Sequence, residues 1–223
     1  MCQTGSCSFV VSLRYRGARK LTNQHSMDEA HFKLVVLRWL LINIAEEEAI
    51  ASEIQFSNGL NRADLVVSSL RRLCSFEIKT PKDDYRRLNR QLAAYRRSFL
   101  ESYVVLSSSS LTAARDILPS YAGILTISDD SNVTLHRKAS PRKRLAREDS
   151  IAWLRASEIR KLSSGTRSNG SPLETIPEFE LTLIALASVY ERIRPKYDAF
   201  KRERGSILNS DDVGMLSLPS RVR

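Results

Sequence analysis

Apolar residues in the first part of the chain follow two spacings, one typical of helices and one typical of strands. After a capping-box pattern at residues 26–29, the helical spacing is followed by Phe32, Val35, Val36, Trp39 and Leu40. In the segment IASEIQF, residues 50–56, apolar and polar side chains alternate up to the turn-forming Ser57-Asn58-Gly59. These patterns predict a helix at 28–44 and a strand at 50–56.

Two further apolar segments predict an antiparallel hairpin. ADLVVSS, residues 63–69, and LCSFEIK, residues 73–79, are rich in strand-forming side chains and are joined by a short basic connection. Thr80-Pro81 then supplies a cap and a first helical residue, and an apolar stripe predicts a helix from there to about Leu100. The following strand, SYVVLSS, should run parallel to the hairpin's second strand because a helix separates the two.

The rest of the chain continues with short elements and ends in a long helix. We expect helices at 111–117 and 149–162, strands at 122–127 and 132–137, and a final helix at 178–203 that Pro195 kinks or ends. A segment rich in Ser, Gly and Pro reads as a linker. The predicted organisation is a basic disordered leader at 1–25, a main domain at 26–162, a linker at 163–177, and a C-terminal helix and tail at 178–223.

The charge of the chain favours a polyanionic partner. Its 223 residues suffice for one core, and 35 Lys and Arg against 25 Asp and Glu give a formal charge of +10. Nucleic acid is the partner that this balance suggests, although a merely basic protein is the alternative. The leader 1–25 also reads as sequence upstream of a true start at Met27, which the mass of the native N-terminus would test.

Cysteine and hydropathy patterns narrow the class of protein further. The three cysteines and three histidines are too scattered for a disulfide framework or a zinc site, so a reducing cytoplasm fits best. The apolar run KLVVLRWLLINIA is interrupted by Lys33 and Arg38. We therefore expect neither secretion nor a membrane span.

Three charged residues stand in the hairpin where an ordinary buried strand carries apolar side chains. Glu77 and Lys79 lie two residues apart on one strand and therefore share a face. Pairing of the strands brings Asp64 within reach of both. Taken alone, an E-x-K tripeptide is more often a solvated cross-strand charge pair, which is the alternative interpretation.

A hard divalent cation would resolve the repulsion between the two carboxylates. Mg²⁺ binds through one or two carboxylates together with phosphate oxygens of a substrate. We expect a site for Mg²⁺, with Mn²⁺ as its substitute, formed by Asp64, Glu77 and the carbonyl of Ile78. Lys79 would hold the attacking water or the scissile phosphate.

Asp64 followed by Glu77-Ile78-Lys79, in an α-β-β-β-α-β context, resembles the PD-(D/E)XK nuclease superfamily. The segments R-A-D-L-V-V, F-E-I-K-T and R-L-x-R-Q-L-x-x-Y are similar to a family of uncharacterised bacterial nuclease-like proteins. The resemblance covers about residues 28–138. It implies an α/β (α+β) class with a restriction-endonuclease-like core, a mixed sheet flanked by helices, with Asp64 and Glu77 as metal ligands and Lys79 as the catalytic lysine.

The resemblance extends to other positions and departs at one. Gln91 and Tyr95 have the spacing of the Q-x-x-x-Y element, in which the glutamine faces the site. The superfamily usually carries an acidic residue on the first helix, for which Glu29 is the candidate and Glu53 the competitor. Ala63 stands where the namesake motif has proline, a substitution common in the superfamily.

Basic residues near these elements are candidates for contacts with the nucleic-acid backbone. They are Arg62, Arg86, Arg90, Arg142, Lys143 and Arg144. The alternative for these side chains is a solvated surface, and Arg62 could instead pair with Asp64 or Glu53.

The predicted function is Mg²⁺-dependent hydrolysis of phosphodiester bonds in DNA. The alternative is a catalytically silent nuclease-like module that binds nucleic acid or a partner protein in repair, mobile-element maintenance or defence. RNA as the substrate, the form of the DNA, and a homodimer or a partner protein stay open.

Overall fold

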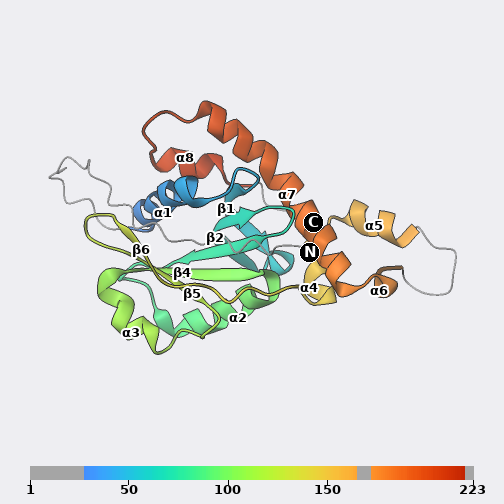
Figure 1. The fold of residues 1–223 in the computed structure, drawn as a ribbon, viewed down its shortest axis with the longest axis horizontal. Coiled ribbons are helices and arrows are strands. Elements are labelled where there is room, and N and C mark those ends of the chain that lie inside the picture. The colour runs from blue at the N-terminus through green and yellow to red at the C-terminus, as the bar shows by residue number, and fades with distance from the viewer. Residues whose placement is uncertain (1–27, 165–171, 219–223) are drawn as a thin grey trace, which may run out of the picture.

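The computed structural model describes residues 28–164 and 172–218. The expectations for the leader at 1–25, for a start at Met27, and for residues 165–171 of the linker lie outside the described residues. Within the described part, the chain forms one mixed sheet flanked by helices, which confirms the mixed α/β class (Figure 1).

The sheet has six strands in chain order. They are β1 (Ala49–Phe56), β2 (Asn61–Ser68), β3 (Leu73–Ile78), β4 (Glu101–Ser107), β5 (Gly123–Ile127) and β6 (Val133–Arg137). β2 pairs antiparallel with β3, as the hairpin pattern predicts, and β1 also pairs antiparallel with β2. β3 and β4 are parallel and joined by a helical crossover, as expected, whereas β5 and β6 return to an antiparallel pair.

Eight α-helices surround this sheet in the described part of the chain. They are α1 (Glu29–Asn43), α2 (Leu88–Ser98), α3 (Leu111–Arg115), α4 (Arg147–Ile151), α5 (Ala156–Ser164), α6 (Pro172–Thr175), α7 (Glu178–Glu203) and α8 (Ser210–Met215). α1 and α7 cover one face of the sheet, and α2 and α3 cover the other (Figure 1).

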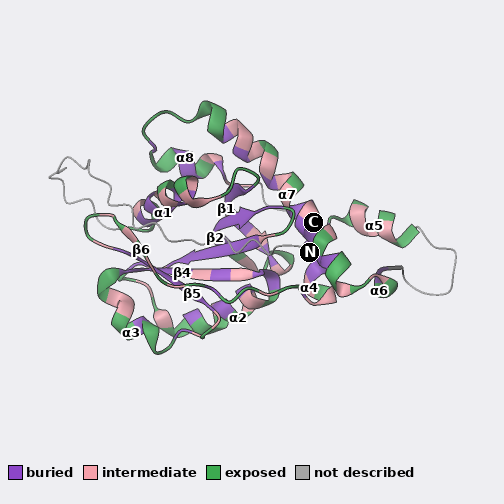
Figure 2. Ribbon diagram, viewed as in Figure 1, coloured by how far each residue is buried: buried purple, intermediate pink, exposed green. Residues whose placement is uncertain are grey.

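The core follows from this arrangement. The larger apolar cluster joins α1 and α7 to β1, β2 and β3, and Figure 2 shows these strands as buried along most of their length. A smaller cluster joins Leu88 and Leu92 of α2 to Val104 and Leu106 of β4. Because side chains of α7 belong to the larger cluster, the C-terminal helix is part of the same core as the sheet.

The helix expected at 149–162 is instead two helices, α4 and α5. Between them the chain turns so that Trp153 and Leu154 are buried, at 2% and 4% exposed. The Trp153 indole N–H donates to the carbonyl of Ser98 at 2.8 Å. Burial of a large aromatic side chain with its polar group satisfied outweighs the interruption of the helix.

The helix expected from Pro81 to about Leu100 begins later, at Leu88, after a 3₁₀ turn at Tyr85–Arg87. The Asp83 carboxylate accepts hydrogen bonds from both the backbone N–H and the hydroxyl of Thr80, at 2.6 and 2.7 Å. These bonds close a local turn, which competes with helix formation at this place.

Pro195 does not end α7, since the helix continues to Glu203, and the kink expected at this residue stays a prediction. Proline removes one backbone hydrogen bond from a helix interior. On either side of it, Ile193 and Tyr197 are buried in the larger core cluster. Packing of this face against the sheet therefore outweighs the missing bond.

The segment after α7 returns to the edge of the sheet, which the sequence pattern did not predict. Ser217 forms a parallel bridge with Ser52 of β1, and the Ser52 N–H donates to the carbonyl of Leu216 at 3.1 Å. The Ser52 hydroxyl donates to the carbonyl of Val213 at 2.7 Å. α8 is thereby fixed beside α1 and β1. No helix within residues 28–164 and 172–218 is long and apolar enough to cross a membrane.

Candidate functional site

Asp64 lies at an interruption in both of the ladders that flank β2. On one side, the register places Glu53 of β1 opposite Asp64. These two residues do not form a ladder pair, whereas the residues before and after them do. On the other side, the ladder ends one position before Asp64, and the register places Glu77 of β3 opposite it. The Asp64 carboxylate accepts the Ile78 N–H at 2.8 Å instead. Side chains thus replace backbone pairing at this point.

Glu53 has a backbone conformation that is unusual for a residue in a strand. Its φ is 55°, in the left-handed region that side chains other than glycine rarely adopt. Such a conformation is unfavourable by about 1 kcal/mol or more and persists where the surrounding structure imposes it. Here it accompanies the missing pair in the ladder, and it brings the Glu53 carboxylate to Lys33 and Arg62.

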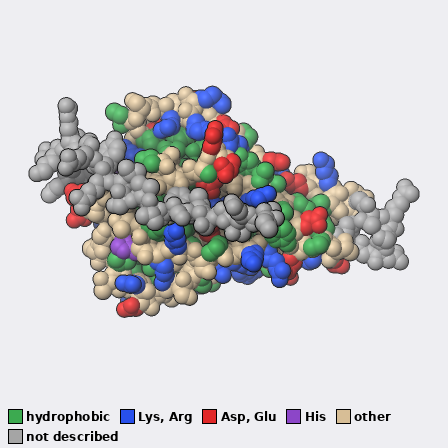
Figure 3. Space-filling model, viewed as in Figure 1, with side chains coloured by type: hydrophobic (Ala, Val, Ile, Leu, Met, Phe, Trp, Pro, Cys, Tyr) green, Lys and Arg blue, Asp and Glu red, His purple; other side chains and the backbone are tan. Residues whose placement is uncertain are grey.

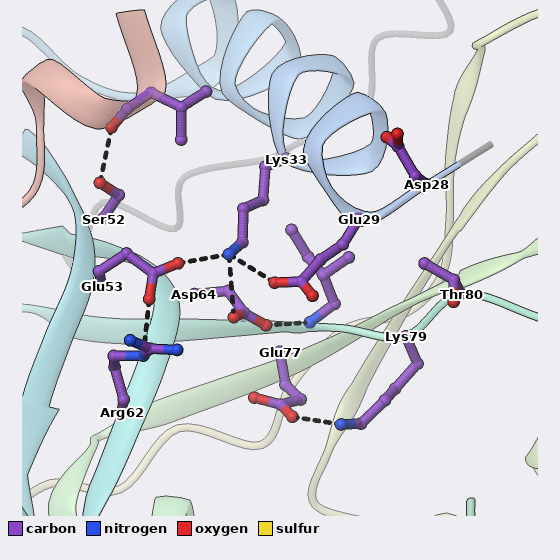
Figure 4. Close-up of polar contacts among 12 residues, drawn as sticks. Asp28, Glu29, Lys33, Ser52, Glu53, Arg62, Asp64, Glu77, Lys79 and Thr80 are labelled. Carbon is purple, nitrogen blue, oxygen red and sulfur yellow. Dashed lines mark hydrogen bonds and ion pairs between the residues drawn. The ribbon is translucent and has the colours of Figure 1, made fainter. Parts of the chain in front are cut away.

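Three carboxylates gather around the Lys33 ammonium. Glu29, Glu53 and Asp64 each offer an oxygen, and these oxygens lie within 4.8 Å of one another. The Lys33 Nζ atom lies 2.6 Å from Glu29 Oε1 and 3.5 Å from Asp64 Oδ1, and it also contacts Glu53 Oε1 (Figure 4). The Lys33 side chain is 12% exposed.

Glu29 is available for this cluster because another residue caps α1. The expected capping box would have used Ser26 and Glu29, but the N-cap is Asp28, whose carboxylate accepts the His31 N–H at 2.9 Å. Glu29 and Lys33 are four residues apart on α1, which places them on one face of the helix. Both of the acidic residues considered as alternatives, Glu29 and Glu53, therefore lie beside Asp64.

Positive charge in the cluster falls short of its negative charge. Burial, together with the nearby charge of Glu77, raises the pKa of Asp64 to about 7. Burial also opposes the charge of Lys33, but hydrogen bonds to Glu29 and Glu53 outweigh it and raise the Lys33 pKa above its usual value. The lysine therefore stays charged, and the aspartate is short of a counter-charge.

Glu77 lies next to this cluster but turns its carboxylate elsewhere. Its Oε1 atom is 2.7 Å from Lys79 Nζ, and its Oε2 atom is 2.5 Å from the Tyr95 hydroxyl. The same hydroxyl lies 3.1 Å from the Arg62 carbonyl, so a single proton serves two acceptors. Burial opposes the charge on Lys79, but the neighbouring Glu77 carboxylate outweighs this effect and raises the pKa of Lys79. Figure 4 shows Asp64 turned toward Lys33, and Glu77 turned toward Lys79.

Gln91 lies one helical turn before Tyr95 on α2, so the two residues share a face of the helix. Its Oε1 atom is buried and accepts no hydrogen bond from the described residues. A buried amide oxygen without a hydrogen-bond donor is uncommon, so this oxygen is a candidate acceptor for a water molecule or a ligand group. Because Tyr95 contacts Glu77, Gln91 is on the side of α2 that faces β3.

The structure thus gathers a somewhat different set of residues than the sequence suggests. Asp64 lies with Glu29 and Glu53, rather than with Glu77, and the Ile78 N–H, rather than its carbonyl, is the group that contacts Asp64. Glu77 and Lys79 form a pair beside the cluster, as expected from their spacing. The metal role of Glu77 and of the Ile78 carbonyl stays a prediction.

Two features of the site were missed from the sequence. In the sequence, Lys33 stands out only as an interruption of an apolar run, although its position four residues after Glu29 is the spacing of a helical ion pair. The second is a hollow of about 380 Å³ beside the carboxylates. α8 forms one wall of it, and no local pattern in the sequence connects this distant segment to β1.

The candidate nucleic-acid contacts have different surroundings. Arg86 and Arg90 are exposed, as is Lys143, and in Figure 3 Lys and Arg side chains gather on the face in view between the positions of α2 and α4. Arg62 is exposed but its Nε atom lies 2.7 Å from Glu53 Oε2. Arg144 is also exposed and pairs with Glu178 at 3.1 Å.

Arg142 differs from these residues because its guanidinium is engaged by the backbone. It donates to the carbonyls of Arg96 and Arg97 in the last turn of α2, where helices leave carbonyl groups without partners. Arg142 therefore stabilises the end of α2. This bonding favours a structural role over a contact with nucleic acid.

Residues 22–216 match the family described as "Bacteriophage P4 protein cII". This match extends from before α1 to just after the end of α8, so it includes every helix and strand around the carboxylates. No curated protein matches the chain. Among solved structures, a protein of unknown function from Silicibacter pomeroyi matches with 14% identity and a TM-score of 0.43 over 79% of this chain and 94% of that protein.

Proposed function

Since the chain belongs to the bacteriophage P4 protein cII family, whose name states no reaction, we propose its function from the site: metal-dependent hydrolysis of phosphodiester bonds in DNA. The proposal includes a restriction-endonuclease-like core of the PD-(D/E)XK kind. It is supported by the order α1-β1-β2-β3-α2-β4, in which Asp64 lies on β2 and Glu77 lies on β3.

The observation that carries the proposal is the carboxylate cluster at the broken ladders. Glu29, Glu53 and Asp64 converge within 4.8 Å, and strain at Glu53 and a pKa of about 7 at Asp64 both accompany this convergence. Backbone strain beside a buried acid with too little counter-charge is more typical of a functional site than of a structural ion pair.

The donor set fits Mg²⁺ and Mn²⁺. Carboxylate oxygens are the ligands that hard divalent cations prefer, and three within reach of one point suffice when water and phosphate complete the shell. Asp64, Glu29 and Glu53 would hold the cation, with Glu77 and the Ile78 carbonyl as further proposed ligands. Such a cation offsets negative charge on the phosphate and makes water a better nucleophile.

The remaining residues have roles that their contacts support. Lys79 is charged and held by Glu77 at 2.7 Å, so it can orient the attacking water or neutralise a phosphate oxygen. Tyr95 holds the other oxygen of Glu77 and so fixes the direction of the pair. Gln91 offers a buried acceptor for water on the same side of the helix. Exposed Arg86 and Arg90 would contact the DNA backbone.

The test is cleavage of duplex, single-stranded and branched DNA, and of RNA, with Mg²⁺ or Mn²⁺. Asp64→Asn and Lys79→Ala should each lower the rate by about 100-fold or more. Exposed Asp116→Asn and Lys82→Ala are matched controls that should cleave like the natural protein. Cleavage that persists unchanged in both site variants would show that another site or a contaminant is responsible.

A second candidate is a nuclease-like module that binds nucleic acid, or a partner protein, without cutting. The observation in its favour is that the Lys33 ammonium already lies among the three carboxylates. Calorimetric titration separates the two functions. Salt-sensitive DNA binding, with no heat from Mg²⁺ or Mn²⁺ and no cleavage, would support the binding module and exclude the hydrolase.

A further inference from the structure

We propose that the carboxylate cluster is a cation-exchange site, in which the Lys33 ammonium is the resident cation and a divalent cation binds by displacing it into the hollow beside α8. This inference rests on the proposed function and deepens it, because it states how the site changes between the cation-free and the cation-bound protein. Lys33 is then a positioning residue that keeps the acids together until the divalent cation arrives.

The first step of the argument is that both cations need the same oxygens. Lys33 Nζ lies 2.6 Å from Glu29, 3.5 Å from Asp64 and in direct contact with Glu53. A divalent cation bound to these three residues would take up nearly the same position, since Mg²⁺ lies about 2.1 Å from its oxygen ligands. Two cations this close would repel each other strongly, so occupation is exclusive.

The second step concerns charge. Three carboxylates face two cationic side chains, Lys33 inside the cluster and Arg62 at its edge, which leaves one negative charge unmatched. Exchange of the ammonium for a divalent cation adds one positive charge at this place and balances the cluster. Exchange is therefore electrostatically favourable, provided that Lys33 finds another environment.

The third step is that Lys33 can leave without disruption of the fold. Its ammonium meets each carboxylate through a single oxygen, and its four-carbon stem has freely rotatable bonds. The Lys33 side chain extends from near the start of α1. The buried apolar residues of this helix hold it in the core independently of Lys33.

The fourth step is the space that would receive it. Beside the cluster is the hollow of about 380 Å³, which is lined by Glu29, Ala30, Lys33, Ser52, Glu53, Ser210, Val213, Gly214 and Ser217. The α8 side of this wall is fixed, because Ser52 holds the carbonyls of Val213 and Leu216. A Cβ atom added at Gly214 would meet no atom within 4 Å, so the hollow is open at this residue.

The experiment measures binding of Mn²⁺ alone, by calorimetry without nucleic acid, to the full chain. Lys33→Met removes the competing charge and keeps most of the length of the side chain, and it should bind Mn²⁺ about tenfold more tightly than the natural protein. Lys138→Met removes the same charge at an exposed position and should leave the affinity unchanged. Equal affinities in all three proteins would overturn the exchange.

A second variant tests the hollow and does not depend on Lys33→Met being folded. Gly214→Phe would fill the space that receives the lysine stem and should weaken Mn²⁺ binding about tenfold. Gly214→Ala is the matched control, because its methyl group leaves the hollow open. Unweakened binding by Gly214→Phe would exclude the hollow as the destination of Lys33.

A direct readout follows the lysine itself. Acetylation of Lys33, measured by mass spectrometry in the natural protein, should accelerate at least about tenfold when Mn²⁺ is saturating, because its ammonium leaves three ion pairs. An unchanged rate would overturn the exchange even if Mn²⁺ binds and DNA is cleaved. Absence of Mn²⁺ binding in both the natural protein and Lys33→Met would instead overturn the proposed function together with this inference.

Discussion

Two ion-pair networks lie at opposite ends of β3, and they differ in how completely their carboxylate oxygens are bonded. At the start of the strand, the Arg72 guanidinium binds Glu101 through two bonds of 3.0 and 3.1 Å and Glu48 through one of 2.9 Å. The second oxygen of Glu48 accepts the Ala45 N–H at 3.0 Å. At the far end, one lysine serves three carboxylates from α1, β1 and β2.

The difference separates a structural network from a candidate site. In the Arg72 network, each carboxylate oxygen has a partner with fixed geometry, and planar guanidinium suits this purpose better than an ammonium. In the Lys33 cluster, burial raises the pKa of Asp64 to about 7, the Glu53 backbone is strained, and open space adjoins the charges. The first network is complete, whereas the second accommodates a further cation.

The largest predicted effect is at the complete network. Arg72→Met should lower the free energy of unfolding by about 4 kcal/mol, because it leaves the buried Glu48 and the partly buried Glu101 without a counter-charge. Urea denaturation measures the loss, and Arg71→Met at an exposed neighbour is the control. Mg²⁺ should not restore stability. A loss below about 1 kcal/mol would remove the structural role of this network.

The next effect concerns the pH dependence of the cation-free protein. The folded pKa of Asp64, about 7, lies above the ordinary value of 3.8, so between these values the folded state holds a proton that the unfolded state releases. The contribution of Asp64 to stability is therefore greatest at low pH and falls as pH rises toward 7. Relative to Asp64→Asn, the natural protein should lose about 3 kcal/mol between pH 4 and pH 7.

Urea denaturation of both proteins at several pH values checks this loss. Curves that stay parallel between pH 4 and pH 7 would mean that the Asp64 carboxylate is well neutralised after all. The contrast with the Arg72 network would then disappear.

A smaller effect tests whether Glu77 can join the Lys33 cluster or is held away from it by Tyr95 and Lys79. Tyr95→Phe removes the hydroxyl 2.5 Å from Glu77 and should destabilise the protein by about 2 kcal/mol, as for a hydrogen bond to a charged group. Tyr121→Phe, at a half-buried ring beside Arg96, is the control. If added Mn²⁺ restores the stability of Tyr95→Phe, Glu77 turns to the cation when its tyrosine is absent.

The smallest predicted effect is at Arg62, at the exposed edge of the carboxylate cluster. Arg62 is 66% exposed in its side chain, so its ion pair with Glu53 is screened by water. Arg62→Ala should change stability by only about 0.5 kcal/mol, as measured by thermal unfolding. A larger loss, insensitive to salt, would show that Arg62 is an essential cation of the cluster and would reduce the room for exchange.

Much of the fold follows from local pattern. Alternation at 50–56 and the paired runs around Arg72 predict β1, β2 and β3 because side-chain periodicity decides which face of a strand is buried. The crossover to β4 follows from the intervening helix. The break between α4 and α5 is different, since it depends on a bond between Trp153 and Ser98, 55 residues apart.

The candidate site is predictable in part for the same reason. The spacing of Glu77 and Lys79 gives their contact directly, and the hairpin places Asp64 nearby. Neither spacing nor pairing reveals that the Glu53 backbone adopts a positive φ or that Asp64 turns toward α1. Those outcomes depend on the tertiary approach of α1 to the sheet, which brings Glu29 and Lys33 to the broken ladder.

The bridge between Ser217 and Ser52 has a consequence for how copies of this protein meet. β1 is an outer strand of the sheet, and outer strands offer unpaired backbone groups to any second molecule that presents a complementary strand. The returning segment occupies part of that surface. A chain that stops after α7 should therefore leave this part of β1 uncovered and self-associate through it, which would show as lower solubility.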